Sequence, residues 1–191
     1  MLHDFIISRV RVKILQLFFL NPAKIHHVRA IVRLVEEEIN AVRRELAHLE
    51  KAGLLSKERR ANRLYYCLRK DYPLYYDLMD LIVKTSALGG DILKNKVKLG
   101  KVKYVMISGK YARNKNRATN DVDLLMVGKV VIPELSHLIR AEEVRREREI
   151  NYTVMSEEEF EFRKKRRDPF VVDILKGSRI MIIGDEEELL G

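Results

Sequence analysis

Residues 38–53 constrain the fold most, because they form an amphipathic helix pattern with a defined end. The apolar residues of this segment recur at helical spacing: Ile39, Val42, Leu46 and Leu49. The opposite face is polar, and Ala47 beside it is small enough to allow close approach of a partner. Gly53 is a typical residue for ending a helix. One face of this helix must therefore be buried in a core, and the other is left for solvent or a binding partner.

Two helix patterns precede this segment, and a hairpin pattern follows it. Apolar residues at helical spacing predict a first helix over 6–20 and a second over about 26–34. After Gly53, two short β-like runs flank a basic turn at 59–63: 54–58 and 64–68. Such a pattern predicts a β-hairpin with a positively charged tip.

The net charge of +9 is concentrated at one end of the chain. Residues 1–70 contain 15 Lys and Arg against 7 Asp and Glu, whereas residues 71–191 contain 22 against 21. This asymmetry predicts a nucleic-acid-binding segment joined to a nearly neutral domain. The alternative is a basic, solvated surface without a partner.

Several classes of protein are disfavoured by the same sequence. No run approaches the roughly 18–20 apolar residues of a membrane span, and the first residues lack the basic-then-apolar layout of a signal peptide. The single cysteine, Cys67, excludes an internal disulfide and a multi-cysteine zinc site. We therefore expect a cytoplasmic protein that does not contact a membrane.

The remainder of the chain divides into a connector and an α/β domain. Residues 71–100 have helical spacing, with Gly89-Gly90 as an expected interruption, and predict a helical linker that is either a dimer contact or a packed connector. Residues 101–191 alternate between strand and helix patterns, which predicts an α/β domain with a mixed sheet. Strands are expected at 102–106, 122–127, 150–155 and 179–183, and helices at 133–145 and 156–165.

Two carboxylates and a glycine turn mark the candidate chemistry of this domain. Asp121 and Asp123 are spaced to share one face of a strand, and hard cations such as Mg²⁺ bind such oxygen ligands. Gly109-Lys110 follows a strand and is expected to open a short helix, whose free N–H groups suit a phosphate. Basic side chains that we expect to bind the same anion follow: Lys110, Arg113 and Lys115. The alternative is a solvated basic loop, with the two aspartates capping local N–H groups.

The run 28–55, VRAIVRLVEEEINAVRRELAHLEKAGLL, resembles the helix-turn-helix of ArsR-like and MarR-like regulators. The resemblance implies a winged helix over 1–70 that binds double-stranded DNA, and a homodimer that reads two half-sites. The implied major-groove residues are Asn40, Arg43, Arg44 and His48, and the implied wing contacts are Arg59, Arg60 and Arg63. The acidic turn Glu36, Glu37, Glu38 departs from the pattern, because many relatives have a Gly and a Ser or Thr there. Since acids repel phosphate, we expect this turn to point away from the DNA backbone or to weaken binding.

The segment 105–128, VMISGKYARNKNRATNDVDLLMVG, resembles the minimal nucleotidyltransferases of the DNA polymerase beta superfamily. That resemblance implies a nucleoside triphosphate with Mg²⁺, with Asp121 and Asp123 as the metal-binding and catalytic candidates. Two positions depart from it: Lys110 stands where the phosphate-binding serine is expected, and Asn151 stands at the third carboxylate. Asn can ligate a metal through its carbonyl but cannot accept a proton; Glu149, on the same expected face, is the possible substitute.

Together these patterns predict a multi-domain chain with a specific division of labour. We expect a winged helix at 1–70, a helical linker at 71–100 and a nucleotidyltransferase-like α/β domain at 101–191. The expected function is a DNA-binding transcriptional regulator whose second domain binds a nucleotide or phosphate ligand, or mediates assembly, without efficient catalysis. One alternative is an active Mg²⁺-dependent nucleotidyltransferase, antitoxin-like or modifying a protein or RNA. Another is a second domain that serves only to dock partners.

Overall fold

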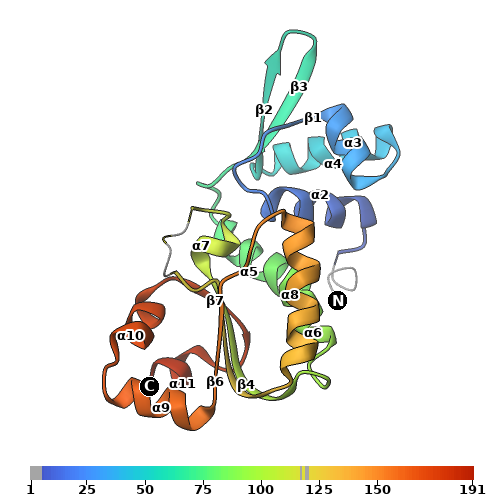
Figure 1. Ribbon diagram of the computed structural model, residues 1–191. Helices are drawn as coiled ribbons and strands as arrows, with labels where there is room; N and C mark the ends of the chain where they lie inside the picture. The colour runs from blue at the N-terminus through green and yellow to red at the C-terminus, as the bar shows by residue number, and fades with distance from the viewer. Residues whose placement is uncertain (1–5, 117, 119–120) are drawn as a thin grey trace. The chain divides into compact units, whose positions relative to one another are not determined.

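The protein has a mixed α/β fold that divides into two compact units. The computed structural model describes residues 6–116, 118 and 121–191, and these residues contain ten helices and two β-sheets (Figure 1). The first unit comprises Met1–Ile82 and the second Val83–Gly191.

Three mutually packed helices form the body of the first unit: α2 (Arg9–Phe19), α3 (Val28–Val35) and α4 (Ile39–Lys51). Ser8 begins α2, because its hydroxyl accepts a hydrogen bond from the Arg11 amide at 3.2 Å. The side chains at the centre of the unit are fully buried and apolar. They include Val12, Phe18, Phe19, Ile31, Val42 and Leu46.

The predicted hairpin is present and belongs to a three-stranded antiparallel sheet. Its strands are β1 (His26–His27), β2 (Leu55–Arg60) and β3 (Arg63–Leu68), in the order β1-β3-β2. Arg60 pairs with Arg63 across the tip, and Leu55 pairs with Leu68 at the base. The second helix begins at Val28 rather than near His26. The His27 side chain accepts a hydrogen bond from the Ala30 amide and so caps the helix, while His26 and His27 pair with β3.

Two helices follow the first sheet: α5 (Tyr75–Thr85) and α6 (Ala87–Lys94). Contrary to expectation, Gly89 and Gly90 lie inside α6 and do not interrupt it. A Cβ at Gly89 would collide with the Val83 carbonyl, and one at Gly90 would lie 2.8 Å from the Thr85 carbonyl oxygen. The glycines therefore allow the start of α6 to pack closely against the end of α5.

A four-stranded mixed sheet forms the centre of the second unit. Its strands are β4 (Gly100–Ser108), β5 (Leu124–Val130), β6 (Tyr152–Met155) and β7 (Arg179–Ile183), in the order β6-β5-β4-β7. β5 and β6 are parallel, whereas β4 is antiparallel to both of its neighbours. The predicted mixed sheet is therefore confirmed.

Helices cover both faces of this sheet (Figure 1). They are α8 (Ile132–Arg146), α9 (Glu157–Lys165), α10 (Pro169–Lys176) and α11 (Glu186–Leu190), together with α6, while the short α7 (Gly109–Ala112) directly follows the end of β4. α6 and α8 lie on one face, and α9, α10 and α11 lie on the other (Figure 1). Coverage of both faces explains why β5 and the second half of β4 contain continuous runs of buried residues rather than alternating ones.

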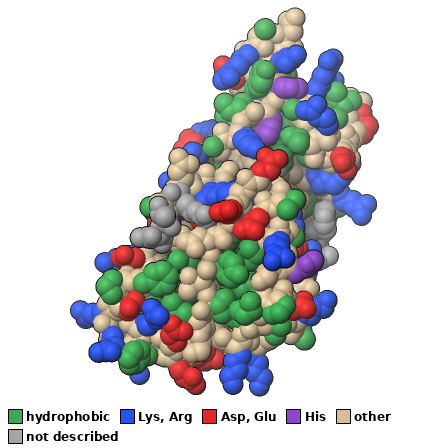
Figure 2. Space-filling model, in the orientation of Figure 1, with side chains coloured by type: hydrophobic (Ala, Val, Ile, Leu, Met, Phe, Trp, Pro, Cys, Tyr) green, Lys and Arg blue, Asp and Glu red, His purple; other side chains and the backbone are tan. Residues whose placement is uncertain are grey.

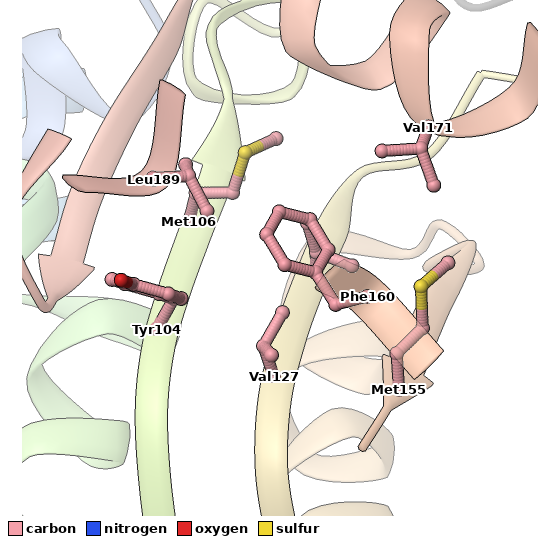
Figure 3. Packing of buried hydrophobic residues seen from close by; sticks show 8 residues of the cluster. Tyr104, Met106, Val127, Met155, Phe160, Val171 and Leu189 are labelled. Carbon is pink, nitrogen blue, oxygen red and sulfur yellow. The ribbon is translucent and has the colours of Figure 1, made fainter. Parts of the chain in front are cut away.

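Phe160, on α9, lies at the centre of the core between the sheet and the helices α9, α10 and α11. It has no exposed surface, and it packs with residues from the sheet and from the covering helices (Figure 3). The cluster consists of Tyr104, Met106, Leu125, Val127, Met155, Phe160, Val171 and Leu189. Phe162, on the same helix, is 58% exposed.

Truncating these two phenylalanines should have very different effects on stability. We expect Phe160→Ala to lower the free energy of unfolding by about 3–5 kcal/mol, because it removes a buried ring and leaves a cavity. Phe162→Ala, the matched control, should change it by about 0.5 kcal/mol or less. Urea unfolding followed by circular dichroism measures both, and equal effects would contradict the assigned core.

Candidate functional site

The two faces of α4 have the burial that its sequence pattern predicts. Val42, Leu46 and Leu49 are buried in the first unit. Every residue predicted to contact DNA from this helix is exposed: Asn40, Arg43, Arg44 and His48. The helix thus presents a continuous outer surface of hydrogen-bond donors, held in place by its apolar inner face.

The acidic turn before α4 has local structural roles that account for its charges. Glu36 ends α3 in the left-handed conformation, with φ of 53°. Glu37 forms an ion pair with Lys13 at 2.7 Å. Glu38 caps α4 by accepting hydrogen bonds from the Asn40 and Ala41 amides at 2.8 and 2.9 Å, and these bonds lower the pKa of its carboxyl.

Glu45 is a buried carboxylate on the inner face of α4 that the sequence patterns did not indicate. It accepts hydrogen bonds from the Ser8 hydroxyl at 2.7 Å and from Arg11 Nε at 2.8 Å. Burial alone would raise the pKa of Glu45, but these two bonds and the Arg11 charge outweigh burial and lower it. Glu45 therefore fixes α4 to the start of α2 through a charged contact.

The hairpin and α4 border a common groove. Arg59, Arg60 and Arg63 are all exposed, and Arg60 pairs with Glu58 at 2.8 Å. A hollow of about 590 Å³ is lined by His27, Val28, Arg29, Arg43, Asn62, Arg63, Leu64 and Tyr66. Figure 2 shows Lys and Arg side chains beside the hairpin. The fold therefore brings arginines of α3, α4 and β3 to one surface, and Arg29 is the member that sequence patterns did not indicate.

A second hollow lies in the second unit, at the glycine turn and the aspartate pair. This cleft has a volume of about 700 Å³. Its polar lining consists of Ser108, Lys110, Arg113, Lys115, Asn116, Asp121, Asn151, Thr153, Asp173 and Ser178. Its apolar lining includes Met106, Val122, Pro169, Phe170 and Ile174.

Gly109 lies next to two cleft residues, Ser108 and Lys110, and its backbone is closely packed. As predicted, α7 begins at Gly109, directly after β4. The Gly109 amide donates to the Ser178 carbonyl at 2.7 Å, and Ser178 Oγ accepts a hydrogen bond from Arg113 at 2.7 Å. A Cβ at position 109 would collide with Ser178 Oγ. Ser178 belongs to a distant part of the chain, and no local pattern indicated it.

The two aspartates differ in exposure and in their partners, although they are only two residues apart. β5 begins at Leu124, so both aspartates precede the strand. Asp121 lines the cleft and accepts hydrogen bonds from Lys110 Nζ at 3.0 and 2.8 Å. Asp123 is 1% exposed; its Oδ1 lies 3.6 Å from Arg148 Nη2, and its Oδ2 accepts a hydrogen bond from the Asn151 amide at 3.1 Å.

Asn151 lines the cleft, and its hydrogen bonds connect the chain before β6 to the chain before β5. Its side-chain Nδ2 donates to the Asp121 carbonyl at 2.8 Å, and its own carbonyl accepts from the Asp123 amide at 2.7 Å. These bonds tie the chain just before β6 to the chain just before β5. Glu149, the possible substitute carboxylate, is exposed and does not line the cleft.

The side chains around the aspartate pair do not fit a divalent cation. Among the described residues, no group of three or more His, Cys, Asp or Glu side chains is placed to hold a metal ion. Each aspartate already lies beside a cation, Lys110 or Arg148, so an approaching Mg²⁺ would meet positive charge at both.

A buried polar network connects α7 to α8 behind the cleft. The Tyr111 hydroxyl donates to Glu142 at 3.3 Å, and burial raises the pKa of Tyr111. Glu142 has no exposed surface and pairs with Arg146 at 2.7 Å and Arg145 at 2.9 Å. The Arg146 guanidinium lies over the Tyr111 ring, 4.3 Å from its centroid. This network fixes the short helix that begins with Gly109.

No protein-family model matches this chain, and comparisons with curated proteins and with solved structures gave no significant match. Of the helices in the described ranges, each is too short or too polar to cross a lipid bilayer. The function must therefore be argued from the geometry of the two surfaces.

The interaction of Glu45 with Ser8 and Arg11 should make stability depend on pH. The pKa of Glu45 is lower in the folded protein than the ordinary 4.5, so the interaction stabilises the fold above that value. This stabilisation disappears as pH falls through the folded pKa. We expect Glu45→Gln to lower the free energy of unfolding by about 1 kcal/mol near neutral pH. The difference from wild type should shrink below a pH of about 4.5.

Urea unfolding of both proteins over a series of pH values measures this effect. Glu50→Gln removes the same charge from a more exposed site of α4, where the partner is Lys57 at 3.1 Å, and should have the smaller effect. A difference between wild type and Glu45→Gln that grows in acid would contradict the assigned interaction.

Proposed function

We propose that the chain is a DNA-binding transcriptional regulator in which the first unit acts as a winged helix. The observation that carries the proposal is the groove shared by α4 and the hairpin, lined by Arg29, Arg43 and Arg63. Arginine guanidinium groups bind phosphate and base edges in two-point geometry. In this proposal α4 enters the major groove, and the hairpin is the wing.

The dimensions and charges of the first unit support this assignment. A helix of 13 residues is about 20 Å long, and an α-helix fits the major groove of B-DNA. The exposed donors along α4 would read bases, and Arg59 and Arg60 would contact the backbone or minor groove near the tip. The glutamates of the acidic turn that have partners, Glu37 and Glu38, are engaged within the protein, which reduces their repulsion of phosphate.

A single winged helix contacts few base pairs, so sequence-specific DNA binding by the first unit would need two half-sites. Proteins with a helix-turn-helix usually bind as dimers to half-sites one helical turn apart. We therefore propose a homodimer as the DNA-binding form.

For the second unit, we propose a nucleotidyltransferase-like domain that binds a nucleotide or another phosphate-bearing ligand without turning it over. The cleft combines three basic side chains at one part with an apolar wall that includes the partly exposed ring of Phe170. This combination suits a ligand with an anionic end and a flat apolar end. The pairing of both aspartates with cations argues against the alternative of an active Mg²⁺-dependent transferase.

Removal of the groove arginines should weaken DNA binding and reduce its salt dependence. We expect Arg43→Ala with Arg63→Ala to weaken binding to a mixed-sequence duplex by about tenfold or more. The slope of log K against log salt should fall by about one for each phosphate that the variant no longer binds. Fluorescence anisotropy at several salt concentrations measures both quantities.

Arg69→Ala is the matched control, because it removes an arginine of the first unit that lies outside α4 and the hairpin and pairs with Asp71. It should leave the affinity almost unchanged. Absence of duplex binding by the wild type at low salt, or equal affinities for the double variant and the wild type, would contradict the proposal.

Nucleotide binding by the second unit should depend on the exposed basic side chains of the cleft. We expect ATP, used as a probe, to bind the full-length protein, and Lys115→Ala to weaken binding by about three- to tenfold because one positive charge is removed. Isothermal titration calorimetry is the measurement, and Lys129→Ala, an exposed lysine outside the cleft, is the control.

Equal weakening by Lys115→Ala and Lys129→Ala would contradict binding at the cleft. The same protein incubated with labelled nucleotides and Mg²⁺ should transfer no label. Transfer that is abolished by Asp121→Asn would instead support the alternative of an active nucleotidyltransferase.

A further inference from the structure

The ammonium of Lys110 occupies the position beside the Asp121 carboxylate that a bound metal ion would take. Its Nζ contacts both carboxylate oxygens, at 3.0 and 2.8 Å, and Oδ2 also accepts a hydrogen bond from the Ala118 amide at 2.9 Å. The Lys110 side chain is about half exposed and lines the cleft. An ammonium has three donors, and the bonds to Asp121 use two of them, so one can serve a ligand.

The charge of Asp123 is compensated by Arg148, whose guanidinium is itself held by a further hydrogen bond. Arg148 lies 3.6 Å from Asp123, and its Nη1 donates to the Lys115 carbonyl at 3.2 Å. Asp123 does not line the cleft. A metal ion could reach it only by displacing a fixed arginine from a buried carboxylate, which is unfavourable.

These pairs change which ligands the cleft can accept. Two unpaired carboxylates would repel phosphate, and a divalent metal would be needed to bridge them to a polyanion. Here the Asp121 charge is balanced within the protein, and Arg113 and Lys115 add positive charge to the lining. A free polyphosphate can therefore approach this surface without a bridging metal.

We propose that Lys110 replaces a divalent cation at Asp121, so that the cleft binds a polyphosphate ligand, such as a nucleoside triphosphate, in its metal-free form. The choice of a polyphosphate as ligand rests on the proposed function of the second unit. The exclusion of a metal ion follows from the Lys110 and Arg148 contacts alone. Free ATP should bind at least as tightly in EDTA as in MgCl₂, because chelation by Mg²⁺ reduces the ligand's charge without supplying a contact.

The test uses the full-length protein and two separate probes, Mn²⁺ alone and ATP alone. Electron paramagnetic resonance detects Mn²⁺ binding in the absence of nucleotide. We expect no specific Mn²⁺ binding by the wild type or by Lys110→Arg, which keeps the positive charge. Lys110→Met, which keeps much of the apolar stem, should bind Mn²⁺ at least about tenfold more tightly than wild type, because the repelling charge is gone. Adding Asp121→Asn to Lys110→Met should abolish that increase in affinity.

Circular dichroism and thermal unfolding confirm that each variant is folded. If Lys110→Met does not fold, Lys110→Ser is a second variant that lacks the positive charge. Mn²⁺ binding by the wild type that disappears in Asp121→Asn would overturn the inference, as would charge-removing variants whose Mn²⁺ affinity does not rise. ATP binding that requires Mg²⁺ would also overturn it. Absence of ATP binding in both EDTA and MgCl₂, with the expected Mn²⁺ results, would contradict the proposed function and leave metal exclusion supported.

Discussion

The buried charge of Asp123 is the constraint on which the arrangement of the second unit depends. A carboxylate removed from water costs several kcal/mol unless charge and hydrogen bonds compensate it locally. Arg148, just after α8, and the Asn151 amide, just before β6, supply that compensation. Since Arg148 also bonds the Lys115 carbonyl, satisfying this one charge connects the chain around Lys115 and Asp123 to the chain between α8 and β6. Lys115 and Asn151, which these contacts hold, are also part of the cleft lining.

The first unit uses carboxylates in the same way, and this use explains its charged surface. Glu37 pairs with Lys13, Glu38 caps α4, and Glu45 bonds Ser8 and Arg11. These acids are engaged in turns and helix contacts, whereas the arginines of α4 and the hairpin are exposed. The acids of the turn are thus occupied within the protein while the arginines remain accessible, which supports the proposal that this unit binds an anionic partner.

The sequence predicted local structure well, because local structure depends on periodicity and on nearby caps. The two faces of α4, the hairpin and the mixed sheet all follow from short-range patterns. Contacts between distant residues were not predictable. The i and i+2 spacing of Asp121 and Asp123 gave no indication of their partners, which come from α7 and from the chain after α8. Glu45 likewise lies on a buried face that its charge would disfavour, because Ser8 and Arg11 satisfy it from more than thirty residues away.

The position of β2 at the edge of its sheet has a consequence for self-association. An open strand edge is a template on which another chain can add a strand, and proteins commonly block such edges with charged residues. β2 is an outer strand in the order β1-β3-β2, and its exposed run Lys57, Glu58, Arg59, Arg60 is mostly cationic. Two copies brought edge to edge would place these cations against each other, which discourages pairing between hairpins and guards the chain against growth into extended sheets.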